Sequence, residues 1–191
     1  RISKGRRHSH ANLYDFVDIQ LFKGKFELMG LDRGQVKNVV DQVEQMFATL
    51  QDTLNVDILG YCLLSNEYHL LIKTPEGNLS RFMRQVDGMY TQTYQNLRNI
   101  AGPVFRARYK SVLVQPGNYL LEVSRYIHAL PRKNKIKPQT YTWSSLAAYS
   151  NKAKSPVWLC KDEVLGSLPA GSRPAARYAA FVAEGVDEEL A

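Results

Sequence analysis

The chain has 191 residues, enough for one domain of ordinary size, and 45% of them are hydrophobic, enough for a packed core. No apolar run approaches the ~18 residues of a membrane helix, so a membrane partner is not expected. The two cysteines lie far apart without a CxxC pattern, so they suggest neither a disulfide framework nor a zinc site, and a reducing cytoplasm is expected. No signal peptide is recognisable, and because the first residue is Arg1 we expect residues upstream of it.

The net charge of +7 is concentrated in one stretch. Residues 1–97 are neutral overall, residues 98–137 carry a net charge of +8, and residues 138–191 carry −1. An excess confined to forty residues is typical of a surface that binds a polyanion such as nucleic acid. A solvated basic face is the alternative that the charge alone leaves open.

The first third of the chain predicts an arm, a strand and a helix. A basic arm covers residues 1–12, and a first strand is expected over Leu13–Leu21. From Asp32 the apolar residues recur at the spacing of one helical face. They are Val36, Val39, Val40, Val43, Met46, Phe47 and Leu50. Such a continuous stripe is typical of a helix that packs on a core.

Residues 57–74 form the stretch around which the chain is organised. Two apolar runs, Ile58–Leu64 and Tyr68–Ile72, flank the polar tripeptide 65–67, which predicts a β-hairpin. Because side chains alternate along a strand, Glu67 and His69 point to the same face, and both are ligand types for divalent metals. On the spacing alone we favour the simpler alternative, in which Glu67 ends the loop and His69 is a structural histidine.

The rest of the chain continues the alternation of helices and strands. A second amphipathic helix is expected over residues 79–97, a fourth strand over Tyr109–Gln115 and a third helix over Tyr119–Leu130, which Pro131 ends. In the tail, a last helix is expected from about Arg173 to Gly185.

This order predicts the fold class α+β: a ferredoxin-like split βαβ antiparallel sheet with helices on one face, plus the third helix and a helical C-terminal tail. We expect three parts: the arm 1–12, a domain at 13–150 and a helical extension at 151–191. Trp143 and Trp158 are expected to pack the tail onto the domain.

Several motifs carry a family resemblance. In chain order they are Gly60-Tyr61-Cys62-Leu63-Leu64-Ser65-Asn66-Glu67-Tyr68-His69-Leu70-Leu71, Thr74-Pro75-Glu76-Gly77-Asn78-Leu79-Ser80, Phe105-Arg106-Ala107-Arg108-Tyr109-Lys110-Ser111, Tyr119-Leu120-Leu121-Glu122-Val123-Ser124-Arg125-Tyr126-Ile127-His128 and Trp143-Ser144-Ser145. They span about residues 13–150. With them the chain resembles the REP-associated tyrosine transposases, a branch of the single-tyrosine HUH transposases that act on single-stranded DNA.

The resemblance implies a nucleophile and a metal site. It makes Tyr126 the catalytic tyrosine of the third helix, although by periodicity alone Tyr126 is a packing residue. Two histidines on the second strand of the hairpin hold the metal in the family; His69 matches one, and Glu67 replaces the other. Leu130 stands where the family has a polar ligand, usually Asn, and Glu122 is a conjectural substitute. Near the first strand, residues 14–16 read Tyr-Asp-Phe where the family tends to have Tyr-His-Val.

The chemistry expected from the resemblance is strand transfer. A neutral phenol is a weak nucleophile, and a divalent ion, Mg²⁺ or Mn²⁺, would polarise the phosphate that it attacks. With Glu67 and His69 as its protein ligands the ion should be weakly bound. The expected phosphate contacts are Arg106, Arg108, Lys110, Arg125, Arg132 and Lys133.

Three tyrosines could contribute aromatic surfaces to DNA binding. Tyr90, Tyr94 and Tyr109 are candidates for base stacking, with core packing the favoured alternative for the first two. His128, on another face of the third helix than Tyr126, is expected to be structural.

Two functions are compatible with the sequence, and different residues favour each of them. The chain is either a transposase that nicks and rejoins single-stranded or hairpin DNA through a phosphotyrosine intermediate, or a descendant that binds DNA hairpins without cleavage. Intact Tyr126 favours the first, while Glu67 and Leu130 favour the second. An unrelated ferredoxin-like RNA-binding domain would leave the ordered motifs unexplained. We expect a bacterial cytoplasmic protein at the nucleoid, and the sequence leaves a homodimer open.

Overall fold

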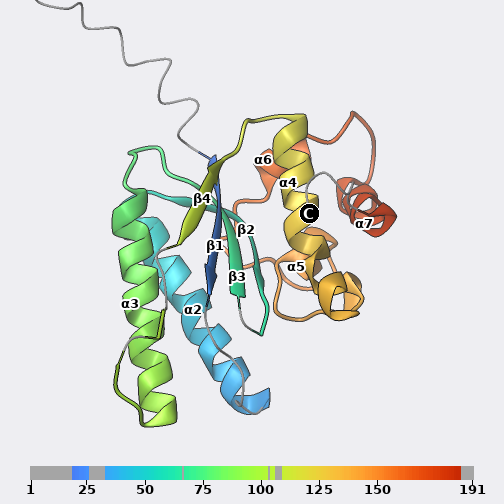
Figure 1. The fold of residues 1–191 in the computed structure, drawn as a ribbon. Helices are drawn as coiled ribbons and strands as arrows, with labels where there is room; N and C mark the ends of the chain where they lie inside the picture. The colour runs from blue at the N-terminus through green and yellow to red at the C-terminus, as the bar shows by residue number, and fades with distance from the viewer. Residues whose placement is uncertain (1–18, 26–32, 66, 103, 106–108, 186–191) are drawn as a thin grey trace, which may run out of the picture.

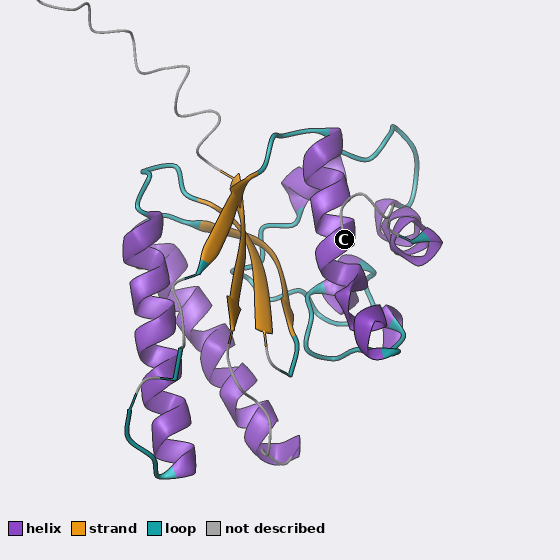
Figure 2. Ribbon diagram, in the orientation of Figure 1, coloured by secondary structure: helices purple, strands orange, loops and turns teal. Residues whose placement is uncertain are grey.

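The chain forms an α+β fold, the class that the sequence predicts. A computed structural model of the protein describes residues 19–25, 33–65, 67–102, 104–105 and 109–185. In it a small antiparallel sheet is sandwiched between helices on its two faces (Figures 1 and 2). The predicted arm 1–12 and the larger part of the predicted first strand lie outside the described residues.

The sheet has four strands in the order β2-β3-β1-β4, and every neighbouring pair is antiparallel. The strands are β1 (Ile19–Lys25), β2 (Asp57–Leu63), β3 (Glu67–Lys73) and β4 (Lys110–Leu113). The predicted hairpin is confirmed as β2 and β3, with Cys62 opposite His69, and the Leu64 N–H donates to the Glu67 carbonyl (2.8 Å) where the hairpin turns. The fourth strand is shorter than the pattern over 109–115 predicts.

Two long helices, α2 (Arg33–Leu54) and α3 (Leu79–Arg98), cover one face of the sheet (Figure 1). Their apolar stripes face inward, as their periodicity predicts. The buried members are Val39, Val40, Met46, Phe47, Leu50, Leu54, Phe82, Met83, Val86, Tyr90 and Tyr94. Helix α3 ends at Arg98, and the left-handed backbone of Asn99 (φ 50°) lets the next N–H, that of Ile100, donate to the Gln95 carbonyl (3.2 Å).

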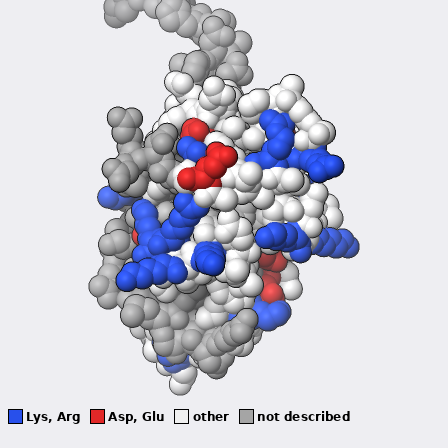
Figure 3. Space-filling model, turned by 90° about the vertical axis from the view of Figure 1, so that its right-hand side faces the viewer, with Lys and Arg blue, Asp and Glu red and all other residues white. Residues whose placement is uncertain are grey.

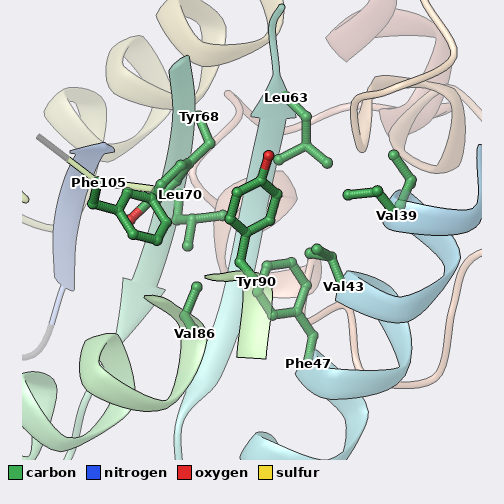
Figure 4. A pocket seen from close by; sticks show the side chains of 10 residues that line it. Val39, Val43, Phe47, Leu63, Tyr68, Leu70, Val86, Tyr90 and Phe105 are labelled. Atoms are coloured by element: carbon green, nitrogen blue, oxygen red, sulfur yellow. The ribbon is translucent and has the colours of Figure 1, made fainter. Parts of the chain in front are cut away.

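Alternation along β3 divides its side chains between the two faces. Tyr68 points toward α3, where its hydroxyl donates to Asp87 (2.9 Å), and Leu70 joins the same apolar layer. This layer encloses a cavity of about 20 Å³, into which side chains of the sheet, both helices and Phe105 point (Figure 4). The cavity is a packing feature of the core, and His69 lies on the other side of the strand.

A third helix, α4 (Asn118–Ala129), packs on the opposite face, against β2 and β3 (Figure 1). The chain then tightens into the 3₁₀ turn η1 (Leu130–Asn134), because Pro131 cannot donate a helical hydrogen bond. A second 3₁₀ turn, η2 (Pro138–Thr140), begins at Pro138. The sheet therefore carries α2 and α3 on one face and α4 on the other.

The C-terminal tail is joined to the outer edge of β2. It holds α5 (Leu146–Tyr149), α6 (Asp162–Gly166) and α7 (Pro174–Glu184). The Leu63 N–H donates to the Trp143 carbonyl (2.9 Å), and the Cys160 N–H donates to the Ile58 carbonyl (2.9 Å). These two segments cover an edge strand that would otherwise expose backbone groups.

Trp158 packs the tail onto the domain, as the sequence predicts. It is 6% exposed, and its ring centre lies 5.4 Å from that of Phe47 on α2 and 5.8 Å from that of Tyr61 on β2. The tail therefore shares the core of the sheet.

Replacing Trp158 with Ala should lower the free energy of unfolding by about 3 kcal/mol, because large aromatic side chains removed from a core cost about 3–5 kcal/mol. Urea unfolding measures the change. The matched control is Val157→Ala, because Val157 is 99% exposed and its loss should change the free energy by less than about 0.5 kcal/mol. A Trp158→Ala variant as stable as this control would show that the tail is not part of the core.

Candidate active site

Helix α4 places Tyr126 over the face of β3 that carries His69. The two rings meet edge to face, with their centres 6.0 Å apart. His69 is 1% exposed and Tyr126 is half-buried, so the tyrosine is the more accessible of the two rings. The contact follows from two regularities: alternation sends His69 to this face, and the apolar stripe of α4 (Leu120, Val123 and Ile127) turns the helix toward the sheet.

Glu67 and His69 come together as their spacing predicts. Glu67 Oε1 lies 3.1 Å from His69 Nε2, and the carboxylate is the more exposed of the two groups. Adjacent ligand atoms of an octahedral ion with bonds of about 2.1 Å are about 3 Å apart. The 3.1 Å distance is that of a hydrogen bond, and it also suits two ligands of one divalent ion.

Within the part of the chain that the structure describes, no further protein ligand joins this pair. Among the described residues no group of three His, Cys, Asp or Glu side chains could hold a metal. Leu130, at the position where the family resemblance expects a polar ligand, is 2% exposed and belongs to the core. Glu122 is ion-paired with Arg125. The described residues thus fit an ion held by two protein donors, with water completing its shell.

Lys133 approaches Tyr126 from the 3₁₀ turn η1. Its Nζ lies 3.4 Å from Tyr126 Oη and 5.2 Å from the centre of the ring. Sequence reasoning predicted Lys133 as a phosphate contact and missed this contact. Tyr126 and Lys133 are seven residues apart, a spacing that places two side chains on the same face of a helix. The contact was not predicted because Pro131 indicated that the helix ends before Lys133.

On its other side α4 is fixed by the buried His128, which is structural as predicted. Its Nδ1 lies 2.6 Å from the Tyr178 hydroxyl of α7, and its Nε2 lies 2.7 Å from Ser145 Oγ. The Tyr178 hydroxyl donates onward to Ser124 Oγ (2.9 Å), so it accepts from His128 Nδ1–H, and Nε2 accepts from Ser145. These bonds suit a neutral imidazole, and burial lowers the pKa of His128 to about 3.

The predicted phosphate contacts have different surroundings. Arg106 and Arg108 lie outside the described residues, and Lys110 is exposed on β4. Arg125 is 7% exposed, pairs with Glu122 and lies 4.3 Å from the ring centre of Phe181 on α7. The guanidinium of Arg132 donates to the carbonyls of residues 182 and 183 (3.0 and 2.7 Å).

The face of the molecule on the α4 side is rich in Lys and Arg, which form several groups around few acidic side chains (Figure 3). Of the tyrosines considered for base stacking, Tyr90 and Tyr94 are both 6% exposed and stack on each other. Both therefore serve the core, whereas Tyr109 is half-buried near Ser80.

Comparisons with known proteins identify the class. A family model described as IS200-like transposase matches residues 32–130, more than half of the chain. The chain belongs to the IS200-like transposase family, which confirms the resemblance seen in its motifs.

A solved structure of a REP-associated tyrosine transposase bound to a REP hairpin is similar to this one, with a TM-score of 0.57. The match covers 90% of this chain and 98% of that one at 14% identity, which shows a shared fold. No curated protein matches the chain. None of the helices in the described part of the chain has the length and apolar character needed to cross a membrane.

The buried His128 predicts a pH-dependent stability. Unfolded His128 gains a proton below about pH 6.5, whereas folded His128 stays neutral down to about pH 3. Its contribution to stability is therefore complete above pH 6.5 and is lost as the pH falls toward 3, by about 1.4 kcal/mol per pH unit. Urea unfolding at several pH values should show the advantage of the parent over a His128→Gln variant shrinking as the pH falls. An advantage that stays constant would contradict a buried neutral histidine.

Proposed function

We propose that the protein binds single-stranded DNA folded into a hairpin and that Tyr126 nicks and rejoins it. The observation that supports this best is the position of Tyr126, between the Glu67–His69 pair and the ammonium of Lys133. The strand order β2-β3-β1-β4 supports a split βαβ scaffold of the ferredoxin-like kind. The REP hairpin bound to the similar solved transposase suggests the form of the DNA.

The reaction we propose is a transfer of the phosphoryl group to the phenol. Tyr126 Oη attacks phosphorus and releases its proton to solvent, while the bond from phosphorus to the 3′ oxygen breaks. The leaving oxygen takes up a proton and becomes a free 3′-OH. The phosphotyrosine linkage keeps the energy of the phosphodiester bond that was broken. A 3′-OH can therefore attack the linkage, release Tyr126 and rejoin the strand.

Glu67 Oε1 and His69 Nε2 are the atoms that would hold a divalent ion in this site. When bound, such an ion withdraws charge from the phosphate oxygens and makes phosphorus more open to attack. Mg²⁺ commonly keeps several water ligands, which suits a site with two protein donors. Weak binding of the ion is the expected consequence.

The phosphate contacts that we propose follow from the family resemblance and from the basic stretch 98–137. They are Arg106, Arg108, Lys110, Arg132 and Lys133. Arg125, also predicted from the sequence as a phosphate contact, is largely buried against Glu122 and Phe181, and its role in this proposal is to hold α4 against α7.

A second function, hairpin binding without cleavage, is favoured by one observation. Leu130 is buried in the core where a further ligand is expected, so the ion would be held by fewer protein ligands than in the family. The two functions share the DNA surface and differ in whether Tyr126 becomes covalently linked.

Covalent capture separates them. Incubated with a labelled hairpin oligonucleotide and Mn²⁺, the parent should form a protein–DNA adduct that survives denaturing electrophoresis, and Tyr126→Phe should form none. Tyr119→Phe is the matched control, because it removes a hydroxyl from an exposed tyrosine of the same helix and should leave the adduct intact. No adduct in the parent under any metal would favour the binding function, and an adduct in Tyr126→Phe would assign another nucleophile.

Binding itself should depend steeply on salt. Each phosphate neutralised on single-stranded DNA contributes about −0.7 to the slope of log affinity against log salt, so four to six contacts give roughly −3 to −4. Replacing Arg106 and Arg108 with Ala should reduce the steepness by about one to two units. Fluorescence anisotropy across a salt series measures both slopes, and a parent slope near zero would exclude nucleic acid as the partner.

A further inference from the structure

Lys133 contacts the atom that reacts in the proposed function. Its Nζ is 3.4 Å from Tyr126 Oη, a long hydrogen bond of a kind that commonly tightens when substrate is bound. The same ammonium lies 5.2 Å from the centre of the ring, within the range of a cation–π contact. A single side chain therefore touches both the ring and the oxygen of Tyr126.

The backbone that carries Lys133 is held on both sides. Before it, Leu130 and Pro131 are buried, and the guanidinium of Arg132 donates to two carbonyls at the C-terminal end of α7. After it, the N–H of Lys135 donates to the carbonyl of Arg132 (2.8 Å), closing the turn. A lysine on a fixed turn loses less conformational entropy on reaching a reacting group than a lysine on a mobile loop would lose.

Two neighbouring cations also have partners within the protein. The guanidinium of Arg125 pairs with Glu122 and lies over Phe181, and that of Arg132 caps α7. Of these three basic side chains near Tyr126, Lys133 is the one that contacts its oxygen.

We infer that Lys133 is a catalytic residue that stabilises the negative charge on the attacking oxygen of Tyr126 and on the phosphate that it approaches. The inference rests on the proposed function, and it goes beyond a general phosphate contact because it assigns Lys133 to the chemical step. A preorganised cation at the place where charge develops lowers the barrier more than it strengthens ground-state binding.

The proton balance is simple. Lys133 keeps its three protons throughout and acts only as a donor of hydrogen bonds and charge. Tyr126 Oη gives its proton to solvent as the bond to phosphorus forms, and the departing 3′ oxygen takes a proton from solvent. Lys133 then faces the oxygens of the phosphotyrosine ester, where the same charge serves the reverse reaction.

The test compares the rate of the covalent step with the affinity for DNA. Single-turnover adduct formation at saturating hairpin DNA gives the rate, and anisotropy in a Tyr126→Phe background gives the dissociation constant. Lys133→Gln should lower the rate about 100-fold, the usual effect of losing one charge-stabilising donor, while raising the dissociation constant less than about fivefold. Lys133→Arg keeps the charge and should retain the rate within about tenfold.

Lys135→Gln is the matched control, because it removes the same charge from the residue that ends the same turn. Its rate at saturating DNA should stay within about twofold of the parent. Because Lys133 is exposed, Lys133→Gln should unfold at the same thermal midpoint as the parent. Measuring this midpoint verifies that the variant is folded.

The outcomes separate this inference from the proposed function. A parent that forms adduct while Lys133→Gln reacts within threefold of it overturns the inference alone. Equal losses of rate in Lys133→Arg and Lys133→Gln overturn the role of the charge. Equal losses of rate in Lys133→Gln and Lys135→Gln would show that Lys133 acts only as part of the basic surface, which also overturns the inference. A parent that forms no adduct overturns the proposed cleavage and this inference with it.

Discussion

The packing of α4 across β2 and β3 is the constraint on which the site depends. Alternation along β3 sends His69 to one face of the sheet and Tyr68 to the other, so only an element on the His69 face can complete a site there. Helix α4 does so with its buried apolar stripe, and Tyr126 lies at the border between this stripe and the surface. Tyr126 is thereby held by core packing and remains partly exposed.

The tail supports this arrangement from behind. Tyr178 of α7 bonds His128, Phe181 lies beside Arg125, and the last carbonyls of α7 accept from Arg132. Each partner on α4 or η1 is within a few residues of Tyr126 along the chain. A helix near the C-terminus is therefore connected to the positions of Tyr126 and Lys133, and its buried residues share the core of the sheet.

Local patterns predicted much of this structure. Period-two and helical spacing were enough for the hairpin, for α2 and α3 and for the shared face of Glu67 and His69, because each depends on neighbours in sequence. The roles of Arg125 and Arg132 were not predictable, since their partners lie on α7, about fifty residues away. The edge of β2, covered by residues 143–145 and 158–160, also depends on contacts that no local pattern encodes.

Tyr126 shows most clearly what local patterns cannot predict. Its helical periodicity predicts a packing residue, and only the family motifs predict a nucleophile. The most direct measurement is therefore to locate the DNA on the protein. Trypsin cuts after Arg125 and Arg132, and Tyr126 is the one tyrosine of the peptide 126–132. After nuclease digestion of a purified adduct, tandem mass spectrometry should find a nucleotide on Tyr126 in this peptide. A nucleotide on any other residue, or the absence of an adduct with every hairpin and metal, would contradict the account.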